Sequence, residues 1–160
     1  MTRAAVALAR VLLASWLGGI LWAGVAAGLL FSSLDEVQAG GVASKLFSWV
    51  SWTGLAAQVA AFVLAPRLFS RPWLSRAALA ACLVIFGFSE GWMRPQMQAL
   101  REKAHPKAVS SSPWAQEFLR WHRLSEGLWG TQALLAAALV ACLGSGCHNE
   151  KSSRISGHEE

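Results

Sequence analysis

The residues best placed for chemistry are charged or polar groups that stand beside long apolar runs. Glu90 and Arg94 are four residues apart with the acid first, which is the spacing of a favourable ion pair on one helix. His122, Ser125 and Glu126 follow at offsets of three and four, so they share one helical face, and Glu126 can orient the imidazole or exchange a proton with it. Charge at membrane depth is costly and marks functional candidates. We therefore predict a binding site formed by these five residues.

Both groups also have a structural interpretation. Glu90 and Arg94 can form a salt bridge at a membrane interface, without any ligand. The His122 cluster can equally serve to hold its helix against the preceding span. The sequence leaves these alternatives open.

Cofactor chemistry and enzymatic catalysis find little support. Cys142, Cys147 and His148 lie together, but Cys-x4-Cys-His is not a typical zinc spacing. His122 and His148 are far apart along one helix, so a two-histidine haem is hard to build in one chain. No Gly-rich phosphate loop, HExxH motif or nucleophile elbow is present. We expect no metal, no other cofactor and no enzymatic activity.

The composition indicates which elements must position these residues. Of 160 residues, 54% are hydrophobic and only 14% are charged, whereas soluble domains carry about 25% charged residues. A soluble fold this small has too little polar surface to cover so much apolar material, so the excess must face lipid. The net charge of +5 is spread over the gaps between apolar runs, which favours membrane topology over a nucleic-acid partner.

Four apolar runs approach the length of about 20 residues that a helix needs to cross a bilayer. The predicted spans are residues 11–34, 46–66, 77–93 and 124–146. Continuous Ala- and Leu-rich runs lack the alternation of barrel strands, and helices satisfy their own backbone. We expect an all-α, polytopic membrane protein, a four-helix transmembrane bundle over residues 1–146 with a polar, disordered tail over residues 147–160.

The first run has a second interpretation. Arg3 and Arg10 followed by residues 11–27 could form a cleaved signal peptide. The run is long for the apolar region of a signal peptide, so we favour a retained span.

The connections are predicted from charges and prolines. Residues 35–44 are expected to join the first two spans, and residues 94–123 the last two. Pro95 is expected to end or kink the third helix. Near the end of the long connection is an apolar stripe at helical spacing, formed by Trp114, Phe118, Trp121 and Ser125. It predicts either an interfacial amphipathic helix or the first turns of a long fourth helix.

Small residues could seat neighbouring helices. Gly24-xxx-Gly28 lies in the first span and Gly87-xxx-Gly91 in the third, and such pairs allow close helix packing in lipid. The partner could be a helix of the same chain, a second copy in a homo-oligomer, or another membrane protein.

The orientation depends on Lys and Arg, and each side of the membrane receives seven. One side has Arg3, Arg10, Arg67, Arg71, Arg76, Lys151 and Arg154, and the other has Lys45, Arg94, Arg101, Lys103, Lys107, Arg120 and Arg123. The short loop over residues 67–76 carries three arginines, and short loops obey the positive-inside rule best. We expect cytoplasmic termini, in the bacterial inner membrane.

Four segments resemble one known family. They are Trp16-Leu17-Gly18-Gly19, Ala39-Gly40 with Lys45-Leu46-Phe47, Pro95-Gln96-Met97, and the Phe118-x3-His122-x2-Ser125 pattern. The chain resembles the transmembrane-protein-205-like family, a bacterial domain of unknown function numbered 4149. The resemblance implies a four-helix membrane protein without a settled activity. Many members have an Asn where this chain has Trp129, so a site using that Asn is not expected here.

Two functions remain. The first is a non-enzymatic membrane protein that has a structural role or binds a partner or solute. The alternative is a transport or redox component that uses Glu90, His122 and Glu126 for protons, or a metal or haem.

Overall fold

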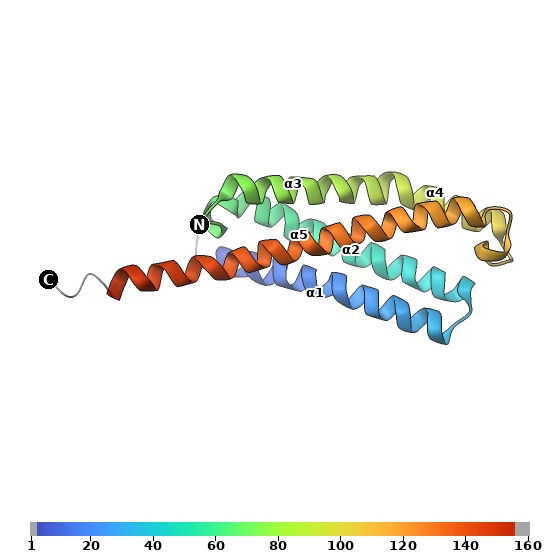
Figure 1. The fold of residues 1–160 in the computed structure, drawn as a ribbon, viewed down its shortest axis with the longest axis horizontal. Coiled ribbons are helices and arrows are strands. Elements are labelled where there is room, and N and C mark those ends of the chain that lie inside the picture. The colour runs from blue at the N-terminus through green and yellow to red at the C-terminus, as the bar shows by residue number, and fades with distance from the viewer. Residues whose placement is uncertain (1–2, 156–160) are drawn as a thin grey trace.

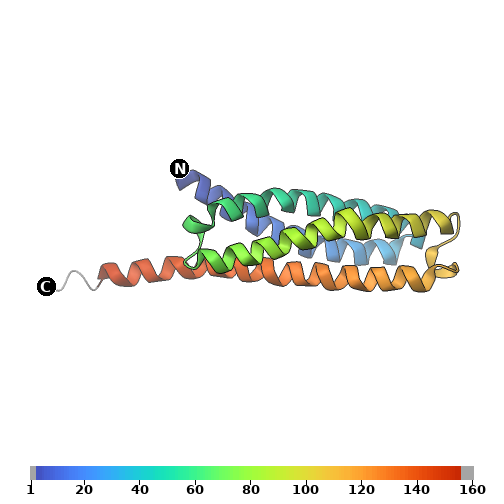
Figure 2. The same ribbon diagram turned by 90° about the horizontal axis from the view of Figure 1, so that it is seen from above.

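The chain folds as a bundle of long helices. The computed structural model describes the backbone of residues 3–155 and the side chains of residues 4–143. In chain order the elements are α1 (Arg3–Ser33), α2 (Glu36–Leu68), α3 (Pro72–Phe88), the π-helix η1 (Ser89–Met93), α4 (Arg94–Ala104), the 3₁₀ turn η2 (Val109–Ser111) and α5 (Ala115–Ile155). The helices lie side by side along one axis (Figures 1 and 2). The described residues include no strand, which confirms the predicted all-α fold.

Within the described part of the chain, four helical stretches are long and apolar enough to cross a membrane. They are Ala4–Ser33, Glu36–Leu68, Pro72–Ala104 and Ala115–Leu143. Large apolar side chains point away from the bundle, and Trp49, Val84 and Leu134 are each more than 70% exposed. An apolar outer surface of this kind needs lipid as its solvent. The protein is therefore a multi-pass membrane protein, as predicted.

The second helix begins ten residues earlier than predicted. Residues 35–44 were expected to be a connection, but α2 starts at Glu36. Asp35 caps the helix, because its Oδ1 accepts a hydrogen bond from the Gln38 N–H at 2.9 Å. The prediction was wrong because charge marked the end of the apolar run and not the end of the helix.

The third helix also continues where the sequence indicated a stop. Arg94-Pro95 does not end it, since α3 passes through η1 into α4. The Arg94 N–H bonds to the Ser89 carbonyl, five residues back. In a regular α-helix, Pro95 would leave one carbonyl without its N–H donor and its ring would clash with the carbonyl four residues earlier. A π turn is wider than an α turn, so the helix can continue past Pro95 with less of this strain.

The fourth span is one continuous helix. Trp114 lies directly before its first residue, Ala115, and the rest of the stripe to Ser125 forms its beginning, so the interfacial-helix alternative is not observed. α5 runs to Ile155 and extends past the other helices (Figures 1 and 2). A disordered tail was predicted from residue 147, whereas α5 continues through residues 147–155, where no Pro or Gly interrupts the helix. Residues 156–160 lie outside the described part of the chain.

The core lies toward the end of the bundle where α1 begins. Leu13, Ile20 and Leu79 are fully buried there, and α1 packs along α2. A Cβ on Gly54 would lie closer than 3.0 Å to the indole of Trp16, so only glycine admits that ring. α1 therefore supplies part of the core of the described bundle.

Candidate functional site

A cavity of about 820 Å³ lies between the spanning helices toward the other end of the bundle. α1, α2, the α3–η1–α4 run and α5 all contribute to its wall. The five predicted site residues, Glu90, Arg94, His122, Ser125 and Glu126, all line it. The rest of the wall consists of Gly24, Ala27, Gly28, Phe31, Gly41, Ala43, Ser44, Lys45, Phe47, Ser51, Phe86, Ser89, Met93, Met97, Gln98, Arg101, Trp129, Gly130 and Gln132. We call it the interhelical cavity.

Missing side-chain volume leaves the interhelical cavity open. Gly24, Gly28 and Gly130 line it, and a Cβ built on any of them would meet no atom within 4 Å. Gly87 and Gly91 also face open space. The predicted packing role of Gly24, Gly28, Gly87 and Gly91 is therefore not seen within the described chain, and packing against another chain stays a prediction.

Glu90 and Arg94 form an ion pair that is largely shielded from solvent. Arg94 Nε lies 3.0 Å from Glu90 Oε2, and the Glu90 side chain is only 12% exposed. Glu90 is part of η1, and π turns are frequent at functional sites. Arg94 Nη2 also donates to the Ser44 carbonyl at 3.1 Å. The pair thus fastens the third span to α2 at the cavity wall.

Arg101 makes a second connection to α2, two helical turns farther along. Its Nη1 donates to the Gly40 carbonyl at 3.0 Å. Its guanidinium carbon lies 5.3 Å from the ring centroid of Phe118, a cation–π distance. These contacts hold the cation at the cavity without a carboxylate within 4.0 Å among the described residues.

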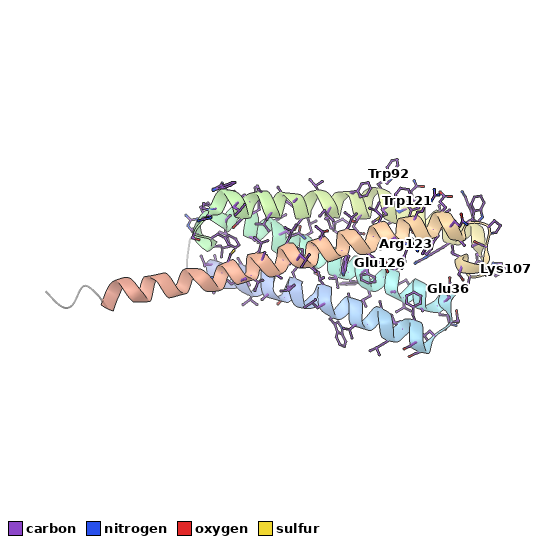
Figure 3. The ribbon with its side chains drawn as sticks, viewed as in Figure 1. Glu36, Trp92, Lys107, Trp121, Arg123 and Glu126 are labelled. Carbon is purple, nitrogen blue, oxygen red and sulfur yellow. The ribbon has the colours of Figure 1, made fainter. Side chains whose placement is uncertain are left out.

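The His122 cluster is more exposed. His122 Nε2 lies 3.4 Å from Glu126 Oε1, and their side chains are 44% and 65% exposed. The imidazole stacks on Phe118 with 5.9 Å between ring centroids. Glu126, labelled in Figure 3, and Ser125 line the interhelical cavity beside His122. The predicted cluster therefore exists, and it faces the same space as Glu90 and Arg94.

Comparison with known proteins identifies a family. The family model described as Domain of unknown function (DUF4149) matches residues 11–106, which is 96 of the 160 residues. The chain belongs to the DUF4149 family. No curated protein and no solved structure matches it. The match begins at residue 11 within α1 and ends just after α4, so Glu90, Arg94 and Arg101 lie inside the DUF4149 region and the His122 cluster lies beyond it.

Metal ligands do not gather in the described part of this DUF4149 chain. Among the described residues, no group of three or more His, Cys, Asp or Glu side chains could hold a metal ion. Cys82 is buried and Cys142 is exposed. The side chains of Cys147 and His148 lie outside the described residues.

Sequence reasoning missed several polar residues of the DUF4149 bundle. Lys45 and Arg101 were counted among the charges that flank the spans and were not predicted as site residues, yet both line the interhelical cavity. Gln132 is buried, and its Nε2 donates to the Cys82 carbonyl at 3.2 Å. Gln58 is only 1% exposed, and its Oε1 has no hydrogen-bond partner in the described chain. An amide inside an apolar run was the available signal for both glutamines.

Proposed function

We propose that this protein is a non-enzymatic membrane protein that binds a solute or partner in the interhelical cavity. The observation that supports this best is the cavity itself, about 820 Å³ between helices that otherwise pack closely. Ligand sites commonly measure about 300–1,000 Å³ and combine an apolar wall with a few placed polar groups. Here charged residues at one end and the aromatic rings of Phe47, Phe86 and Trp129 form such a wall.

Glycine substitutions on α5 test the proposal. Gly130→Leu fills the interhelical cavity, whereas Gly127→Leu, one turn earlier, projects into open space that is not part of the wall. Native mass spectrometry of the full chain, purified in mild detergent, reports retained small molecules. We expect Gly130→Leu to lose adducts that the wild type and Gly127→Leu keep. Equal occupancy in all three proteins would remove the cavity as the binding site.

A second candidate is proton-coupled transport through the His122 cluster. Its support is the 3.4 Å separation of His122 Nε2 and Glu126 Oε1 at the cavity wall. In proteoliposomes with a pH-sensitive dye inside, His122→Ala and Glu126→Gln should slow proton entry while the helical circular dichroism spectrum is unchanged. If liposomes that contain the wild-type protein admit protons no faster than empty liposomes do, this candidate is rejected.

We also propose a bacterial inner-membrane location, cytoplasmic termini and kinship with transmembrane-protein-205-like proteins. The short arginine-rich loop between α2 and α3 supports the orientation. The Phe118, His122 and Ser125 pattern at the start of α5 supports the kinship. Reporter fusions at the C-terminus, active only on one side of the membrane, test the orientation.

Blue native electrophoresis tests whether the exposed face with Gly87 and Gly91 joins a second copy or another membrane protein.

A further inference from the structure

The cations around the interhelical cavity are not all paired with carboxylates among the described residues. Its wall includes three basic side chains, Lys45, Arg94 and Arg101. Arg94 is neutralised by Glu90 at 3.0 Å, but neither Lys45 nor Arg101 has a carboxylate within 4.0 Å among the described residues. Glu36 acts on Arg101 electrostatically from beyond that distance. Two cations beside one cavity attract an anion.

Glu126 is the remaining carboxylate of the wall. It pairs with His122, and its side chain is 65% exposed, so solvent screens its charge strongly. Arg101 is less exposed than this and is held in place by the Gly40 carbonyl and the Phe118 ring. A fixed guanidinium binds a phosphate group well because its N–H groups are already oriented.

The two cations lie at the depth of lipid headgroups. Lys45 is the last charged residue of α2 before the uncharged stretch from Leu46 to Pro66, and cations that flank a span lie at the membrane interface. Arg101 contacts Gly40, which is on the water side of Lys45 along α2. A phosphate between these cations would therefore be level with the phosphates of the surrounding leaflet.

Farther from the two cations, the wall of the cavity carries three aromatic rings and leads toward the hydrocarbon. Phe47 follows Lys45 into the uncharged stretch and meets Trp129 edge to face, with 4.8 Å between centroids. Phe86, from the third span, also belongs to this wall. Gly130 leaves space beside them. A chain of methylene groups fits such a wall, whereas a free inorganic anion would leave it unfilled.

We propose that the interhelical cavity binds one anionic phospholipid. The headgroup phosphate lies between Lys45 and Arg101, and one acyl chain lies against Phe47, Phe86 and Trp129. This inference rests on the proposed function, since it names the ligand class of the same cavity.

Lipid titrations of the purified full chain test the charge. Native mass spectrometry compares phosphatidylglycerol with phosphatidylcholine of the same acyl chains. We expect phosphatidylglycerol to bind about tenfold tighter, and Lys45→Gln and Arg101→Gln each to remove most of that preference. Lys107→Gln and Arg123→Gln, which remove exposed cations outside the cavity wall, should keep it. Both control residues are labelled in Figure 3.

Each other outcome overturns the proposal in a recognisable way. Equal affinity for the two lipids, or equal losses in the Lys107→Gln control, rejects the anionic headgroup. Displacement of phosphatidylglycerol by inorganic phosphate alone rejects the lipid in favour of a free anion. If circular dichroism shows that Arg101→Gln misfolds, the test depends on Lys45→Gln, which changes an exposed side chain. Unchanged preference for phosphatidylglycerol in Lys45→Gln would then reject the proposal. The broader proposal survives any of these if Gly130→Leu still reduces adducts relative to Gly127→Leu, and falls only if it does not.

Discussion

The two ends of the bundle use small residues in opposite ways. Where α1 begins, Gly54 lets the Trp16 ring enter, and Leu13 and Ile20 are buried around it. Where α4 and α5 meet, Gly28 and Gly130 face empty space and the interhelical cavity remains. A glycine in a membrane helix therefore closes a contact only when a large side chain is opposite it. Otherwise the same residue type preserves a space.

The largest expected effect concerns the closed end. Gly54→Leu places a side chain where Trp16 now lies. Since overpacking a core costs about 1–3 kcal/mol and a whole indole is displaced here, we expect a loss of about 3 kcal/mol. Thermal unfolding in detergent, followed by circular dichroism, measures it. Gly18→Leu, on α1 and facing open space, is the control. Wild-type stability for Gly54→Leu would mean that the two ends do not differ as described.

A smaller loss is expected at the cavity wall. Glu90→Gln removes the carboxylate partner of Arg94, which keeps its bond to the Ser44 carbonyl. We expect a loss of about 2 kcal/mol, because the pair is mostly shielded but one hydrogen bond remains. The same unfolding assay compares it with Glu102→Gln, an exposed acid on α4. If both variants lose the same amount, the Glu90 pair is no stronger than a surface contact.

Gln58 should respond in the opposite direction. Its buried Oε1 has no partner in the described chain, so Gln58→Leu removes an unsatisfied polar group from the closed end. We expect stability to be unchanged or to rise by up to about 1 kcal/mol. A clear decrease in stability would show instead that the Gln58 amide has a hydrogen-bond partner in the membrane.

The smallest effect is expected at His122. The pair with Glu126 is exposed, so His122→Ala should change stability by less than about 0.5 kcal/mol, and high salt should remove only the part that comes from the ion pair and not the part from stacking on Phe118. Unfolding at low and high salt measures it. A large loss would mean that the cluster fastens α5, as its structural interpretation held.

The sequence predicted the fold better than the site because lipid leaves few choices. Apolar runs must become helices in hydrocarbon, so the spans could be placed from composition. The early start of α2 could also have been read, since Asp35 followed by Glu36 is a strong helix start. The cavity could not have been predicted, because Gly28 and Gly54 are the same residue type in the sequence and differ only in which atoms face them in the fold. The role of Arg101 likewise depends on α2 passing beside it.

The π turn at Ser89–Met93 also sets the rotational phase of everything after it. Each residue turns an α-helix by about 100°, so one extra residue per turn rotates α4 by that amount relative to α3. Arg94 and Arg101 reach the carbonyls of Ser44 and Gly40 in this phase. If this turn became a regular α turn with all its residues kept, both guanidinium groups would rotate away from α2, whereas deleting Gly91 would remove the extra residue and keep them in place. The π turn thus absorbs one residue and keeps two cations aligned with a neighbouring helix.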